Sequence, residues 1–188
     1  RQCLPGTNPN LLPPILHNNI TEKGNLFSLY SMKGMLKRSL AYIGSFGPLV
    51  LFGVIAAAIF SRGIDIAGVV LLLAWKPIGM ALNSILKWMI NEPRPKGSIH
   101  LNDWERYLDK GTKGMPSGHA QFVGSELAMT ICMGLPVWLQ VYSGLQSAIT
   151  LWQRYAYKKH TIAQLCAGFF VGAVYSIFYC SFLKRHID

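Results

Sequence analysis

Long apolar segments separated by short polar turns constrain this chain more than any other feature of its sequence. Residues 39–60, 64–90 and 162–183 are each long enough to cross a membrane, because a crossing helix needs about 20 mainly apolar residues. Residues 119–139 and 143–157 are expected to form two further spans, the second shorter and less apolar. The sequence therefore predicts an all-α, polytopic membrane helical bundle with about five transmembrane helices.

The composition supports a membrane protein rather than a soluble one that binds nucleic acid. Of the 188 residues, 51% are hydrophobic and 14% are charged, whereas a soluble domain usually carries about 25% charged residues. In a soluble protein, the formal net charge of +10 would suggest nucleic acid. Here the basic residues cluster between the apolar segments, where phosphate head groups or an anionic substrate would lie. We therefore expect membrane lipids as partners and no nucleic acid.

The N-terminal part differs in composition from the rest of the chain. Residues 1–25 are rich in Pro, Asn and Gly and are expected to form an irregular arm. Residues 26–38 mix bulky apolar groups with Lys and Arg, which is typical of an interfacial amphipathic helix or of a basic flank to the first span. The expected division is an arm with an interfacial segment over 1–38 and a membrane domain over 39–188.

Three short stretches carry residue types that suit chemistry on a phosphate group. They are Lys87–Pro95 (KWMINEPRP), Pro116–His119 (PSGH) and Arg154–Gln164 (RYAYKKHTIAQ). Each stretch lies at the end of an apolar segment. If successive spans alternate in direction, all three stretches lie on the same face of the membrane. The topology therefore predicts one polar site at a membrane surface.

The cations and the turn in these stretches favour binding of a phosphate. Arg94 and Arg154 carry planar guanidinium forks that can each bind two phosphate oxygens. Lys87 lies seven residues before Arg94, so both can face one site if the helix persists between them. Ser117 and Gly118 precede a helix, whose first N–H groups and dipole suit an anion. Ser117 can donate its hydroxyl or cap that helix.

Two histidines, His119 and His160, can divide the chemistry of phosphoryl transfer between them. One imidazole must be neutral to attack phosphorus, and the other must be protonated to release the leaving group. Histidine titrates near neutral pH, so either residue can take either role. The residues alone leave that assignment open.

The three stretches resemble the signature of the type 2 phosphatidic acid phosphatase (PAP2)/vanadium haloperoxidase superfamily, K-x6-RP, PSGH and SR-x5-H-x3-D. The first two parts match fully. The third part matches at Arg154 and His160, with Gln153 in place of Ser and Gln164 in place of Asp. The resemblance covers roughly residues 80–175.

The resemblance implies roles for these residues and a mechanism without a metal ion or other cofactor. It implies that His160 is the nucleophile that forms a phosphohistidine and that His119 is the general acid. The remaining residues of the signature would hold the phosphate: Lys87, Arg94, Ser117, Gly118 and Arg154.

Gln164 is the departure from the signature with the largest chemical consequence. The family's Asp would accept a hydrogen bond from Nδ1–H of His160, fix its tautomer and support the imidazolium. A Gln carbonyl can orient the ring but supplies no charge, which should lower the basicity of His160. Alternatively, Thr161 and Gln164 have the spacing of a helix capping box, and both interpretations remain open.

The same departure points to a branch of the family. EPRP, GMPSGHAQF and HTIAQ look most like the dolichyl diphosphatases, in which H-T-x-x-Q replaces the Asp. This implies a polyprenyl diphosphate substrate, such as dolichyl diphosphate, and the endoplasmic reticulum membrane. A broad lipid phosphate phosphatase acting on phosphatidate-like monoesters is the alternative. A different class, an inactive membrane protein that binds lipid phosphate, also fits a lost Asp at Gln164.

Two charged residues lie inside the predicted spans, where charge is costly and often functional. Lys76 lies eleven residues before Lys87, and Glu126 lies seven residues after His119, so each faces nearly the same way as its site residue. We expect Lys76 and Glu126 to pair below the phosphate site. The alternative is that each reaches water or a polar neighbour separately.

Overall fold

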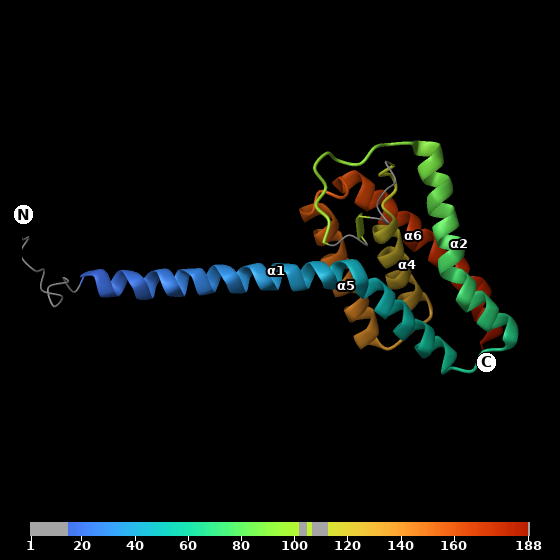
Figure 1. Cartoon of the computed structure of the whole chain (residues 1–188). Coiled ribbons are helices and arrows are strands. Elements are labelled where there is room, and N and C mark those ends of the chain that lie inside the picture. The colour runs from blue at the N-terminus through green and yellow to red at the C-terminus, as the bar shows by residue number, and fades with distance from the viewer. Residues whose placement is uncertain (1–14, 102–104, 107–112, 188) are drawn as a thin grey trace, which may run out of the picture. The chain divides into compact units, whose positions relative to one another are not determined.

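The computed structural model describes residues 15–101, 105–106 and 113–187 (Figure 1). Within these residues, the regular elements are all helical. They are α1 (Ile15–Phe60), α2 (Ile66–Ile90), α4 (Gly118–Cys132), α5 (Val137–Ala156), α6 (Ile162–Leu183) and the short 3-10 helix η1 (Lys184–His186). The predicted all-α architecture is confirmed.

The chain divides into two compact units, Arg1–Ser39 and Leu40–Asp188. In the first unit, the described residues are helical from Ile15 onward. The irregular arm expected over 1–25 is therefore wrong for residues 15–25, and residues 1–14 of that arm lie outside the described part. The second unit contains the predicted site residues and is the subject of the following paragraphs.

Three helical segments are long and apolar enough to cross a membrane: Gly34–Phe60, Ile66–Ile90 and Ile162–His186. Large apolar side chains project from these helices away from the protein interior, among them Leu73 and Phe178, which are 64% and 67% exposed. Extensive exposed apolar surface of this kind suits contact with lipid. These features support an integral membrane protein.

The helix expected over 119–139 is divided by a turn, so that expectation is wrong in its second half. α4 ends at Cys132 and α5 begins at Val137, earlier than expected. Gly134 has a φ of +56°, a left-handed conformation that favours glycine, and Pro136 immediately precedes α5. At 15 residues, α4 is shorter than the roughly 20 residues of a full crossing.

Helix α2 begins and ends at side chains suited to each role. Asp65 Oδ1 accepts a hydrogen bond of 2.6 Å from the backbone N–H of Gly68, which caps the N-terminus. At the other end, Asn91 adopts a φ of 52° and its N–H donates to the carbonyl of Lys87. The helix therefore stops before Arg94, so the condition under which Lys87 and Arg94 would share a helix face is not met.

A buried apolar core joins the helices of the second unit. Trp75 of α2 is fully buried, and its Nε1–H donates to Ser176 Oγ of α6 at 2.9 Å. Arg62, in the turn before α2, donates to the carbonyls of Met133 and Gly134 at 2.6 and 2.8 Å. The core comprises Leu51, Ile55, Ile59, Leu72, Trp75, Met129, Met133, Leu135, Leu139, Tyr179, Cys180 and Leu183.

Helices α4 and α6 run side by side and approach each other backbone to backbone (Figure 1). Three glycines make this approach sterically feasible, because a Cβ at each would overlap a backbone carbonyl of the other segment. The pairs are Gly124 with Phe169, Gly168 with Ser117, and Gly172 with Gln121. The close packing sets the start of α4 directly beside the start of α6.

Candidate active site

Four segments meet where α2 and α5 end and where α4 and α6 begin. The last turns of α2 and α5 carry Lys87 and Arg154. Ser117 caps α4, and Gly118 and His119 are its first two residues. Arg94 follows α2, His160 precedes α6, and Gln164 lies in the first turn of α6. The structure thus places all the predicted site residues at this junction: Lys87, Arg94, Ser117, Gly118, His119, Arg154, His160 and Gln164.

His160 is held by the side chain of Gln164. His160 is 4% exposed, and its Nδ1 lies 3.2 Å from Gln164 Oε1. The carbonyl oxygen of Gln164 can only accept, so Nδ1 carries the proton and Nε2 carries the lone pair. A neutral imidazole with its lone pair on Nε2 is the form that a nucleophile requires.

Gln164 also completes a capping box. It therefore both orients His160 and caps α6, which are the two interpretations that the sequence left open. Its Oε1 accepts from the backbone N–H of Thr161 at 3.3 Å, and Thr161 Oγ1 accepts from the N–H of Gln164 at 3.2 Å. The amide nitrogen Nε2 donates to Glu92 Oε1 at 2.7 Å and to the carbonyl of Pro93 at 2.9 Å. The three bonds made by Oε1 and Nε2 fix which end of the amide faces His160.

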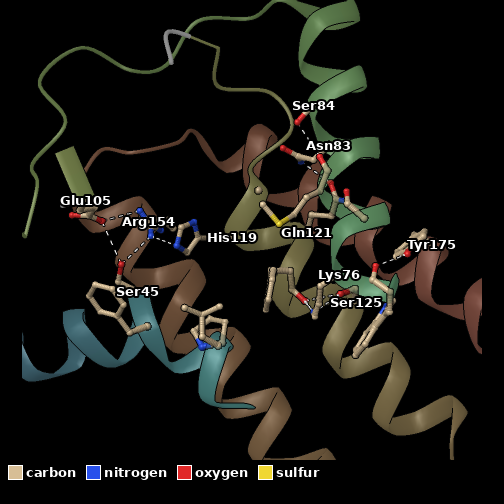
Figure 2. A pocket seen from close by; sticks show the side chains of 18 residues that line it. Ser45, Lys76, Asn83, Ser84, Glu105, His119, Gln121, Ser125, Arg154 and Tyr175 are labelled. Atoms are coloured by element: carbon tan, nitrogen blue, oxygen red, sulfur yellow. Dashed lines mark hydrogen bonds and ion pairs between the residues drawn. The ribbon is translucent and has the colours of Figure 1, made fainter. Parts of the chain in front are cut away.

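Arg154 is 1% exposed and links several polar groups of the site (Figure 2). Its Nη1 lies 3.0 Å from Glu105 Oε1, and its Nη2 lies 3.1 Å from Ser45 Oγ. The same Nη2 contacts Nε2 of His119. Because arginine only donates, Nε2 of His119 accepts in this arrangement. The guanidinium therefore lies close enough to His119 for both to act on one bound anion.

Glu105 and Lys159 belong to this polar cluster and were not among the predicted site residues. Glu105 is 5% exposed, and its Oε2 lies 3.5 Å from Nζ of Lys159. Lys159 is fully buried and contacts His100 Nδ1 at 2.6 Å. The chain has 8 acidic against 18 basic residues. The small number of acidic residues could have indicated Glu105 from the sequence. A carboxylate near three basic stretches is a candidate partner for a buried cation.

Gln153, which stands where the family signature has Ser, packs between helices. It is fully buried on α5. A Cβ added at Gly44 of α1 would lie 2.7 Å from Gln153 Cβ, so α1 and α5 approach closely at this position. This departure from the signature therefore contributes to the packing of α5 against α1.

The surroundings of His160 favour its neutral form. Burial lowers the pKa of His160 to about 3, and the nearby positive charges of Arg94, Lys87 and Arg154 act in the same direction. The hydrogen bond with Gln164 acts against this lowering. An anionic phosphate among these cations would offset their charges, so binding of phosphate should make His160 more basic.

The lowered pKa of His160 predicts a pH-dependent stability. An unfolded His ionises near pH 6.5, so between about pH 3 and 6.5 the unfolded chain binds more protons than the folded chain. The stability from neutral His160 is fully present above about pH 6.5 and decreases as the pH falls toward 3. We expect the unfolding temperature in detergent to fall more between pH 7 and 5 in the wild type than in His160→Gln. Equal decreases in the two proteins would contradict this assignment.

The start of α4 presents backbone donors beside the two histidines. Ser117 is fully buried, and its Oγ accepts from the N–H of Ala120 at 3.5 Å, so it caps the helix. Its own N–H donates to the carbonyl of Gln164 at 3.0 Å. Gly118 leaves space beside Asn83, because an added Cβ would lie 3.4 Å from Asn83 Oδ1. The first N–H groups of a helix can bind an anion.

An apolar pocket of about 390 Å³ opens from the polar cluster into the space between α1, α2 and α4 (Figure 2). His119, Arg154, Glu105 and Ser45 line one part of it. Trp75, Lys76 and Tyr175 line another part. The walls between them include Phe46, Leu49, Met80 and Phe122. The pocket thus joins charged groups that suit a phosphate to a surface that suits a hydrocarbon chain.

Lys76 and Glu126 form the predicted ion pair, with Nζ 3.3 Å from Oε1. Glu126 is fully buried, and Lys76 is 7% exposed where it lines the pocket. Nζ of Lys76 also donates to Ser125 Oγ at 3.0 Å and lies 3.6 Å from the centroid of the Phe122 ring. Pairing, hydrogen bonding and the aromatic face together compensate the burial of this charge.

Comparisons with known proteins agree with this architecture. A model of the PAP2 superfamily matches residues 66–188. A crystal structure described as the first transmembrane PAP2 type phosphatidylglycerolphosphate phosphatase from Bacillus subtilis superimposes with a TM-score of 0.57 at 18% identity. The match covers 93% of this chain and 80% of that one, and at this identity it shows the fold. No curated protein sequence matches the chain significantly.

Proposed function

Because the chain belongs to the PAP2 superfamily, we propose that it is an integral membrane lipid phosphatase that hydrolyses a polyprenyl diphosphate of the dolichyl type. The family and the fold support a phosphatase hydrolase. One observation carries the proposal: His119 and buried Arg154 contact each other and line an apolar pocket between helices, and the charge of Arg154 also acts on His160. With such a substrate, the proposed location is the endoplasmic reticulum membrane.

The proposed reaction proceeds through a phosphohistidine. Lys87, Arg94, Arg154 and the start of α4 hold the terminal phosphate, and their charges stabilise the transferring group. Nε2 of His160 attacks phosphorus, and the bond from phosphorus to the leaving oxygen breaks as the P–N bond forms. Protonated His119 donates its proton to that leaving oxygen.

The second half of the reaction returns the enzyme to its starting state. His119, now neutral, accepts a proton from water as the water oxygen attacks phosphorus. The P–N bond breaks, inorganic phosphate leaves, and His160 is neutral again.

In the first step the phosphate must compete for the guanidinium that contacts His119 in the substrate-free protein. That exchange would free His119 Nε2 to take up the proton it later donates.

A monoester substrate is the second candidate. The similar structure is described as a phosphatidylglycerolphosphate phosphatase, whose substrate carries a terminal phosphate monoester on a lipid. The apolar pocket suits a diacyl lipid as well as a polyprenyl chain. The HTIAQ stretch favours the diphosphate, because it resembles the branch that acts on dolichyl diphosphate.

A phosphate-release panel tests the proposal. The purified protein in detergent with EDTA is offered dolichyl diphosphate, phosphatidate, phosphatidylglycerolphosphate and glucose 6-phosphate, and kcat/KM is measured for each. We expect release without added metal and the highest kcat/KM for dolichyl diphosphate. A preference for either glycerolipid would instead support the monoester phosphatase. Failure to release phosphate from any of the four would favour the inactive binding protein.

A further inference from the structure

We propose that Glu92 is a positioning residue, whose carboxylate acts on His160 through the side-chain amide of Gln164. The pair Gln164 and Glu92 would then supply the negative charge that an Asp at position 164 supplies in the family signature. The inference rests on the proposed function, because it assigns His160 as the nucleophile.

The contacts form a continuous chain of three side chains. His160 Nδ1 lies 3.2 Å from Gln164 Oε1, and Gln164 Nε2 lies 2.7 Å from Glu92 Oε1. The amide thus accepts from the imidazole at one end and donates to the carboxylate at the other. Gln164 itself is fully buried, and His160 is 4% exposed. Glu92 is half-buried, so its charge acts on these buried groups more strongly than it would across bulk water, although solvent partly screens it.

The chemistry of the amide group transmits the charge. A hydrogen bond from an amide N–H to a carboxylate is charge-assisted and shorter than a neutral one. It draws electron density toward the carbonyl oxygen, since hydrogen bonds in a chain polarise one another. Oε1 of Gln164 then becomes a better acceptor for Nδ1–H. His160 should become a stronger nucleophile, and the cationic ring formed in the reaction should be stabilised.

The local packing holds the amide in this orientation. Gly114 lies against its face, because an added Cβ would be 2.7 Å from both Oε1 and Nε2 of Gln164. The N–H of Gly114 donates to the backbone carbonyl of Glu92 at 2.6 Å. The segment before α4 therefore clamps Glu92 and Gln164 together. A flipped amide would turn a carbonyl oxygen toward the carboxylate and the carbonyl of Pro93.

The negative charge of Glu92 would also offset the excess of positive charge around His160. Three cations, Arg94, Lys87 and Arg154, act on the imidazole from the phosphate side. They favour phosphate binding but oppose the positive charge that His160 gains when it attacks. The carboxylate of Glu92, which is linked to Nδ1 through the Gln164 amide, would counteract these charges.

An isosteric charge swap tests the inference. Glu92→Gln retains an acceptor for the Gln164 amide but removes the charge, so we expect kcat to fall about 10-fold with KM little changed. Gln164→Glu places two carboxylates in contact and should also lower kcat. In the double variant Glu92→Gln/Gln164→Glu, the amide donates to a carboxylate that accepts from His160. We expect the double variant to have a higher kcat than either single variant, although a carboxylate oxygen then faces the Pro93 carbonyl to which Gln164 Nε2 donates in the wild type.

The double variant separates charge transmission from a merely structural role. If Glu92 only held the loop after α2, both single losses would persist in the double variant, and the inference would be overturned. An unchanged kcat in Glu92→Gln would overturn it as well while leaving the phosphatase assignment intact. The inhibition constant of inorganic phosphate should stay within about twofold in all variants, because the phosphate-binding cations are unaltered.

A spectroscopic measurement distinguishes failure of this inference from failure of the proposed function. In protein labelled with ¹⁵N-histidine, the Nδ1–H proton of His160 is assigned by its loss in His160→Ala. We expect this resonance to move upfield in Glu92→Gln, because its hydrogen bond weakens. An unmoved resonance would overturn the charge transmission even if the protein released no phosphate from any substrate in the panel.

Discussion

Replacing His160 by Ala is expected to reduce phosphate release by about 10⁴-fold or more, because loss of a nucleophile removes the covalent route entirely. The phosphate-binding cations and the start of α4 are unaltered in this variant. Inorganic phosphate should therefore still inhibit residual turnover or, if none remains, still raise the unfolding temperature. The measurement is kcat/KM with dolichyl diphosphate in EDTA.

His186→Ala is the matched control for this variant. His186 lies in η1, and its Nδ1 is 3.0 Å from Asp65 Oδ2 at the start of α2. It pairs with the end of α2 that lies opposite Lys87 and the site. We expect wild-type kcat/KM in His186→Ala. An active His160→Ala enzyme would show that His160 is not the nucleophile.

His119 can be separated from His160 by the choice of leaving group. His119→Ala should lower kcat for dolichyl diphosphate by about 10²- to 10⁴-fold, the usual contribution of a general acid. With p-nitrophenyl phosphate the loss should be much smaller, because nitrophenolate leaves without a proton. His160→Ala should remain inactive with both substrates. Equal losses in His119→Ala for the two substrates would count against its role as the general acid.

Gly172→Ala adds a single methyl group and is expected to lower the free energy of unfolding substantially. The added Cβ would lie 2.7 Å from the carbonyl carbon of Gln121 and would overlap its oxygen. Both are backbone atoms of α4, so no side chain can rotate away and the helices must separate. Overpacking of this kind destabilises by about 1–3 kcal/mol and occasionally by more.

The stability and the activity of Gly172→Ala should fall together. Separation of α4 from α6 would move Ser117 and His119 away from Gln164 and His160, because Ser117 N–H donates to the Gln164 carbonyl. Gly144→Ala is the control, since Gly144 lies in α5 with nothing within 4 Å of its added Cβ. We expect Gly144→Ala to unfold at or above the wild-type temperature, because Ala favours helix over Gly. Equal unfolding temperatures for Gly172→Ala and Gly144→Ala in detergent would refute the backbone contact.

The sequence predicted two of the helices well and missed where others begin and end. Apolar length predicted α2 and α6 within a few residues, because a long apolar run has few other uses. The expected helix over 119–139 failed at Gly134 and Pro136, where the apolar character continues but the backbone turns. Hydropathy does not respond to backbone conformation, so the turn was visible only in the Gly and Pro residues themselves.

The sequence also contained an indication of the close approach of α4 and α6, which a hydropathy profile does not detect. Gly168 and Gly172 are four residues apart in an apolar helix, the spacing of small residues at a helix–helix contact. The spacing predicts a face but not its partner. Only the structure shows that Gly124 of α4 belongs to the same contact.

At the site, motif spacing predicted which segments meet but not how their charges are balanced. Glu105, Lys159 and Glu92 each contact a residue of the signature or a neighbour of one. Glu105 lies 49 residues from Arg154, and Glu92 lies 72 residues from Gln164. Helix and strand periodicity relate only residues that are close in the sequence, so these pairs could not be predicted from it.

Taken by itself, the amino-acid order determined that apolar helices would bury their backbone polar groups and leave three polar stretches at one end. It also determined the residue types for phosphate chemistry, because cations, imidazoles and a Ser-Gly turn retain their chemistry in any fold. Tertiary structure alone decided which carboxylates reach Arg154 and Gln164, and hence how charge is distributed around His160. The reason is that charge interactions depend on distance and burial, and these are set by helix packing rather than by position along the chain.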